Sequence, residues 1–141
     1  HEEPAMIKPI MKSEFFLRLP SEDAGPDDAA TGQDLLDTLH EHERECVGLA
    51  ANMIGVRKRI ICVKDGNRAL LMYNPQILEQ VNAYQTSEGC LSLAGERPCT
   101  RYRRIKVEYL DENFVHRIKN FSGYTAEIIQ HEIDHCNGVV I

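Results

Sequence analysis

The sequence predicts an α+β fold in which antiparallel β-sheets pack around a C-terminal helix, with a further helix near the N-terminus. Three observations support this fold class. A helical pattern follows a polar segment in the first third of the chain, short apolar and alternating runs begin after Gly48, and the last segment again has helical spacing. Strands followed by one helix are typical of an antiparallel sheet packed on that helix.

The N-terminal helix is expected after residues 20–33, which are polar, rich in turn-forming residues and interpreted as a loop. Asp27 or Asp28 would cap this helix, and the helix would run to about Arg44. Its apolar face would consist of three leucines, Leu35, Leu36 and Leu39.

The strands are predicted from short runs bounded by turn signals. They comprise residues 59–63, 69–73, 104–109 and about 114–121. A turn signal at residues 65–67 joins the first two strands, and Asn74-Pro75 is expected to end the second. Residues 104–109 alternate between apolar and polar side chains, as a half-buried strand does, and a turn at residues 111–113 leads to its partner.

The C-terminal helix is expected to begin near Ser122, as its cap, and to end at Asn137-Gly138, where a left-handed backbone is required. Its apolar side would carry three isoleucines, Ile128, Ile129 and Ile133. The same helix would present the segment His-Glu-Ile-Asp-His at residues 131–135.

Length, composition and charge narrow the function classes. With 141 residues, 43% of them apolar, the chain can bury one core. Its net charge of −6 argues against nucleic acid or an anionic membrane surface as the main partner. The basic run at residues 101–104 could hold an acidic group, but is interpreted as the solvated face of a strand. No apolar stretch approaches the roughly 20 residues that cross a bilayer.

The cysteines and the first residues indicate the compartment and the natural start of the protein. Five cysteines without a secretory signal are interpreted as free thiols in a reducing compartment, which predicts a cytoplasmic protein. Because the chain begins with His1, residues 1–5 are interpreted as an addition to the natural sequence, with Met6 as the natural first residue. Residues 6–141 are expected to form a single catalytic domain.

The strongest chemical signal is the pair His131 and His135. Residues four apart share one face of a helix, so both imidazoles can bind one metal ion. Glu132 lies beside them and can take a proton from an attacking water. A surface helix with solvated histidines and carboxylates would contain the same residues, so a third ligand is needed to support a metal site.

The third ligand is expected upstream of the helix. Cys136 directly follows His135 and would point about 100° away, which disfavours it. Residues 88–92 contain Cys90, whose thiolate is a strong ligand for a borderline dication, and Gly89 allows the backbone to approach closely. Taken alone, Cys90 would be interpreted as a buried core cysteine. A peptidase of the zincin class is disfavoured because its usual downstream ligand is missing.

Three segments, in this order and spacing, resemble the motifs of the peptide deformylase family. They are residues 48–51 (Gly-Leu-Ala-Ala), 88–92 (Glu-Gly-Cys-Leu-Ser) and 130–135 (Gln-His-Glu-Ile-Asp-His). The resemblance extends over roughly residues 6–141. It implies an amide hydrolase that removes a formyl or related acyl group from the N-terminal methionine of nascent peptides. N-formylmethionyl peptides are the implied substrates, and the ribosome is a further candidate partner.

The resemblance also implies roles for individual residues. Cys90, His131 and His135 would hold one divalent metal, which is expected to be iron(II) natively, with zinc, nickel or cobalt as alternatives in purified protein. Glu132 would be the acid/base, and the backbone N–H of Leu91 would donate to the developing oxyanion. The other implied residues are Gly48 and Met53 in the catalytic region, and Val47, Arg97 and Ile128 in substrate binding.

The first motif departs from the family pattern at two positions. Cys46 replaces a glycine, and Met53 replaces a glutamine whose amide supports the oxyanion. A thioether cannot donate a hydrogen bond, and losing one oxyanion donor typically lowers the rate by about 10²–10³. Asn52 is the one neighbouring amide that could substitute. Reduced activity is therefore expected, and a divergent paralogue with a binding or regulatory role is the alternative.

Overall fold

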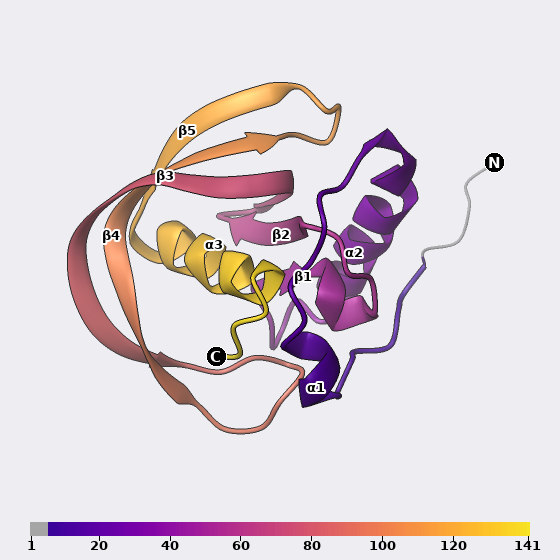
Figure 1. The fold of residues 1–141 in the computed structure, drawn as a ribbon, viewed down its shortest axis with the longest axis horizontal. Helices are drawn as coiled ribbons and strands as arrows, with labels where there is room; N and C mark the ends of the chain where they lie inside the picture. The colour runs from indigo at the N-terminus through magenta and orange to yellow at the C-terminus, as the bar shows by residue number, and fades with distance from the viewer. Residues whose placement is uncertain (1–5) are drawn as a thin grey trace.

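The computed structural model describes residues 6–141, and its strands curve around one central helix (Figure 1). The helices are α1 (Glu14–Leu17), α2 (Ala29–Glu41) and α3 (Gly123–Cys136), with short 3-10 turns η1 (Pro26–Asp28) and η2 (Ala51–Ile54). The strands are β1 (Gly48–Ala50), β2 (Ile60–Asp65), β3 (Arg68–Glu88), β4 (Arg97–Leu110) and β5 (His116–Ser122). Residues 1–5, the predicted addition, lie outside the described part of the chain.

All five strands belong to one antiparallel sheet in the order β1-β2-β3-β4-β5, so each strand pairs with the next one along the chain. Helix α3 lies inside the curve of this sheet, and α2 lies beyond β2 (Figure 1). An antiparallel sheet packed on a C-terminal helix, with a helix near the N-terminus, confirms the predicted α+β class.

The prediction that Asn74-Pro75 ends a strand is wrong, because β3 continues to Glu88. The two residues instead form an irregularity between the register pairs of Tyr73 and Gln76. Asn74 has a left-handed φ of 54°, its carboxamide oxygen accepts the N–H of Ala24 at 2.7 Å, and its amide donates to the Ala24 carbonyl at 2.9 Å. The turn signal therefore produces a β-bulge, which bends the strand without ending it.

Other predicted boundaries also shift. Strand β4 begins at Arg97 rather than near residue 104, since its first half lacks the apolar alternation that marks a half-buried strand. Helix α2 ends at Glu41 rather than near Arg44. Asp28 occupies its N-cap position, but the carboxylate of Asp28 accepts the N–H of Gly25 at 2.8 Å and does not cap α2.

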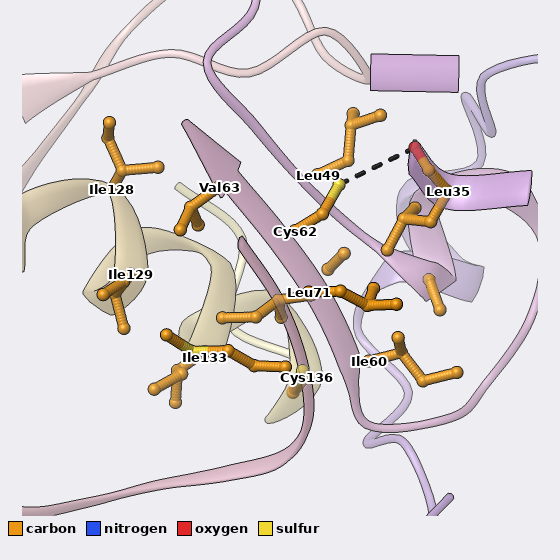
Figure 2. Packing of buried hydrophobic residues seen from close by; sticks show 14 of the residues in the cluster. Leu35, Leu49, Ile60, Cys62, Val63, Leu71, Ile128, Ile129, Ile133 and Cys136 are labelled. Carbon is orange, nitrogen blue, oxygen red and sulfur yellow. Dashed lines mark hydrogen bonds between the residues drawn. The ribbon is translucent and has the colours of Figure 1, made fainter. Parts of the chain in front are cut away.

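The core has two layers, one on each side of β2. Successive side chains of a strand point to opposite faces, and the first four residues of β2 are all buried. Figure 2 shows Val63 on the side of Ile128 and Ile129 of α3, whereas Cys62 faces Leu35 of α2, to whose carbonyl its thiol donates at 3.6 Å. The predicted isoleucines of α3 are all buried, so this face anchors the helix to the sheet.

The last helix begins and ends close to the predicted residues. Ser122 is its N-cap residue, although its hydroxyl makes no capping hydrogen bond, and Gly138 follows the helix with a left-handed φ of 76°. None of the helices in residues 6–141 combines the length and the apolar character that crossing a bilayer requires.

Candidate functional site

The C-terminal half of α3 brings three potential metal ligands together. The ligand atoms of His131, Glu132 and His135 all lie within 4.8 Å of one another, and all three residues are buried. The two imidazole rings are 5.1 Å apart between centroids. Helical spacing therefore presents both rings to one point in space, as a shared metal ion requires.

The hydrogen bonding of His135 fits a divalent cation. Neither ring nitrogen of His135 has a hydrogen-bond partner within residues 6–141, although both are buried. Burial, with the nearby His131 and Arg101, lowers the pKa of His135 to about 3, so its imidazole is neutral and offers a lone pair. A buried nitrogen without a partner costs free energy, and a bound dication would satisfy it.

His131 is oriented by a carboxylate. Its Nδ1 lies 2.8 Å from Oε1 of Glu88, which leaves Nε2 as the free ring nitrogen. Burial acts to lower the pKa of His131, but the hydrogen bond to Glu88 together with the negative charges of Glu132 and Glu88 outweighs it, so the pKa is raised. A carboxylate on the second nitrogen is the usual partner of a metal-binding histidine, because it fixes the ring and makes it more basic.

Glu88 holds His131 as part of a larger buried network, which we call the carboxylate clasp and which comprises Glu88, Arg101, His131 and Asp134. Arg101 donates from Nη2 to Oε1 of Glu88 at 2.7 Å and from Nη1 to Oδ2 of Asp134 at 2.8 Å. Burial of Glu88 acts against its charged form, but hydrogen bonds from His131 and Arg101 hold its pKa below its usual range. The clasp joins the end of β3, the middle of β4 and α3.

The expectation that residues 101–104 form a solvated strand face is wrong for Arg101, which is only 4% exposed. Arg103 and Arg104 are exposed, as expected. On β4, Arg101 has the same parity as the buried Ile105 and Val107, but the exposed Arg103 has that parity too, so strand alternation alone does not place Arg101 inside. Sequence reasoning missed the clasp because the acidic partners of Arg101 lie 13 and 33 positions away.

Glu132 occupies the position expected of a proton-transfer group. It is buried, its Oε1 has no hydrogen-bond partner within residues 6–141, and burial raises its pKa to about 7. A carboxyl group that titrates near neutrality can both take up and release a proton. A Cβ at Gly48 would lie 2.9 Å from Oε2 of Glu132 and 2.7 Å from Cγ2 of Ile128, so a glycine is needed for β1 to lie this close to α3.

A cavity of about 850 Å³ opens beside these residues. Eight of the ten residues to which the resemblance assigns a role line it: Val47, Gly48, Met53, Cys90, Leu91, Ile128, His131 and Glu132. They come from β1 and the residue before it, η2, the β3–β4 connection and α3, so residues far apart in sequence meet at one hollow.

Three of the predicted site residues lie outside either the close group of ligands or the cavity lining. Cys90 is half-buried in the cavity wall and is not part of the close group formed by His131, Glu132 and His135. His135 is fully buried and is not among the residues that line the cavity. Arg97 begins β4 outside the cavity lining, and its Nη1 is buried without a hydrogen-bond partner within residues 6–141.

The two residues that depart from the deformylase motif also lie at the cavity. The thioether sulfur of Met53 is 3.5 Å from the backbone nitrogen of Ala50, and Met53 is buried. The thiol of Cys46 donates to the Gly48 carbonyl at 2.9 Å, and burial raises its pKa to about 12. Asn52 is turned away, because its amide donates to the His135 carbonyl at 2.9 Å.

Residues 10–141 match the family model described as polypeptide deformylase. The chain belongs to the peptide deformylase family. A peptide deformylase of Clostridium beijerinckii is 51% identical over 136 residues, which cover 96% of this chain and 100% of that relative. Peptide deformylases are hydrolases, so the chain is a member of a hydrolase family.

Solved structures of the family have the same fold. The class I type b peptide deformylase of Acinetobacter baumannii bound to actinonin is 31% identical, with a TM-score of 0.84, over 96% of this chain and 95% of that one. The same enzyme bound to Met-Ala-Ser is 28% identical, with a TM-score of 0.85, over 97% of each chain.

We expect Arg101→Met to destabilise the protein by about 3–5 kcal/mol, because removing one partner of a buried ion pair leaves Glu88 buried and uncompensated. Urea-induced unfolding of the metal-free protein measures this loss. Arg104→Met is the matched control on the same strand, where an exposed side chain should cost no more than about 0.5 kcal/mol. Equal losses in the two variants would show that the clasp does not stabilise the fold.

Proposed function

We propose that the protein is a metal-dependent deformylase that hydrolyses the formamide bond of N-formylmethionyl peptides. The observation that carries the proposal is the buried pair of imidazoles beside Glu132 at one cavity, with the nitrogens of His135 lacking any partner in the described chain. In this proposal residues 6–141 are the catalytic domain. Nascent chains are the substrates, near the ribosome and in the cytoplasm.

Cys90, His131 and His135 would hold the metal, with iron(II) as the native ion and zinc, nickel or cobalt as possible replacements in purified protein. A bound dication would supply Lewis acidity, which polarises the formyl carbonyl and makes a nearby water more acidic. Glu88 would keep the His131 ring in the binding orientation through its 2.8 Å contact with Nδ1.

The chain's own groups would carry the proton transfers. Glu132 would take a proton from the attacking water and deliver it to the leaving amine nitrogen, for which a pKa of about 7 is well matched. The backbone N–H of Leu91 would donate to the oxyanion as charge develops. Val47 and Ile128 would contact the methionine side chain. Arg97, the other predicted substrate residue, does not line the cavity and would act only at its edge.

A catalytically silent paralogue gains no support from the comparisons. The relative from Clostridium beijerinckii, which this chain matches along its whole length, is itself named a peptide deformylase. We therefore treat Met53 as a residue that lowers the rate of this reaction, and not as a sign of a different role.

Formate release from formyl-Met-Ala-Ser by the iron(II)-loaded protein tests the function, with Glu132→Gln as the matched variant. Glutamine keeps the size and hydrogen bonding of Glu132 but cannot act as the base, so formate release should fall by about 10² or more while metal content persists. Equal rates would show that Glu132 is not the base. A fully metal-loaded wild-type protein that releases no formate would contradict the proposed function.

Met53→Gln should raise kcat, by up to about 10²–10³, because an added donor near the oxyanion strengthens its hydrogen bond as charge builds in the transition state. The double variant with Cys46→Gly controls for the side chain that replaces the family glycine in the same segment. Steady-state kinetics of wild type, single and double variants, each loaded with iron(II) without air, provide the measurement. If both variants stay as slow as wild type with full metal content, Met53 does not limit the rate.

A further inference from the structure

The wall of the cavity continues along α3 beyond the catalytic residues. Tyr124, Glu127, Ile128 and His131 line it, with the spacing i, i+3, i+4 and i+7 that defines one face of a helix. Glu127 lies one helical turn before His131, about 6 Å along the axis at 1.5 Å per residue. This separation is comparable with the reach of an extended methionine side chain, and Glu127 lines the same cavity as Val47 and Ile128, which the proposed function places against that side chain.

Glu127 is held in place at this position. It is half-buried, and the hydroxyl of Tyr84 on β3 donates to its Oε1 at 3.3 Å. Hydrogen bonding with Glu88, together with burial, raises the pKa of Glu127, so its carboxyl group is closer to neutral than an exposed glutamate would be. Beside Val47 and Ile128, the cavity wall therefore carries a polar group that Tyr84 holds in place.

The surroundings behind Glu127 are polar rather than apolar. Glu127 and Tyr124 also line a second hollow of about 550 Å³, whose far side includes Arg103 and Arg104. The guanidinium of Arg103 lies 4.7 Å from the centre of the Tyr84 ring. Two arginines thus line a hollow that shares Glu127, and their positive charge disfavours a cationic group near it.

We propose that Glu127 is a specificity-determining residue, and that it lets the cavity accept acyl peptides whose first side chain ends in a neutral hydrogen-bond donor, such as the amide of glutamine, beside methionine. In a purely apolar pocket an amide loses its hydrogen bonds with water and gains none, which disfavours it. A carboxyl oxygen of Glu127 accepts the amide N–H and removes that penalty. This inference rests on the proposed function, because it assumes that the first side chain occupies this part of the cavity.

The test is competition between formyl-Gln-Ala-Ser and formyl-Met-Ala-Ser in one reaction, for wild type, Glu127→Leu and Glu127→Gln. The ratio of the two kcat/KM values does not depend on the fraction of active protein, so partial misfolding of a variant cannot imitate the effect. Glu127→Leu should lower the glutamine-to-methionine ratio about tenfold, the scale of one hydrogen bond left unmade. Glu127→Gln keeps an acceptor and should change the ratio little.

Binding of the product peptides Gln-Ala-Ser and Met-Ala-Ser, measured by calorimetry, provides a second readout that needs no turnover. Glu127→Leu should weaken the glutamine peptide selectively. If neither the kcat/KM ratio nor the binding ratio changes in Glu127→Leu, or if Glu127→Gln changes them equally, the inference is wrong. If wild type releases no formate from either peptide, the proposed function fails, and the binding ratio alone decides the role of Glu127.

Discussion

One buried carboxylate, Glu88, links the curved sheet to the helix that carries the proposed catalytic groups. It ends β3, accepts hydrogen bonds from Arg101 on β4, and lies 2.8 Å from Nδ1 of His131 on α3. Charged groups are stable in the interior only when they are paired and hydrogen-bonded, so these elements must meet with the correct geometry for Glu88 to be buried at all. The same contact that satisfies Glu88 sets the orientation of His131, one of the proposed metal ligands.

The length and the irregular register of β3 explain why the sheet is curved. β3 spans 21 residues and pairs first with β2 and then with β4, with irregular register near Asn74. The bend lets the far end of β3 return to α3 (Figure 1), where Glu88 and then Cys90 reach the cavity. Gly48 allows β1 to approach from the other side, so the cavity forms between a strand end and a helix face.

Local sequence patterns predicted most of the elements but not how they end or what they bury. The four-residue spacing of Ile129 and Ile133, and of His131 and His135, is sufficient to predict α3 and the face that carries both histidines, because helical period is a local property. The extent of β3 was not predictable from a turn signal at Asn74, since its side chain is satisfied by Ala24, which lies 50 positions away. Burial of Arg101 likewise depends on partners 13 and 33 positions away, which no local pattern contains.

X-ray absorption at the metal edge of the zinc-loaded protein tests the metal site most directly. Coordination by Cys90, His131 and His135 predicts one sulfur at about 2.3 Å and two imidazole nitrogens at about 2.0–2.1 Å. Cys90→Ser should remove the sulfur contribution, whereas Cys46→Ser, which changes the other thiol that lines the cavity, should leave it intact. A tightly bound zinc without sulfur in its coordination shell would contradict the assignment of Cys90, and with it the three-ligand site on which the proposed chemistry depends.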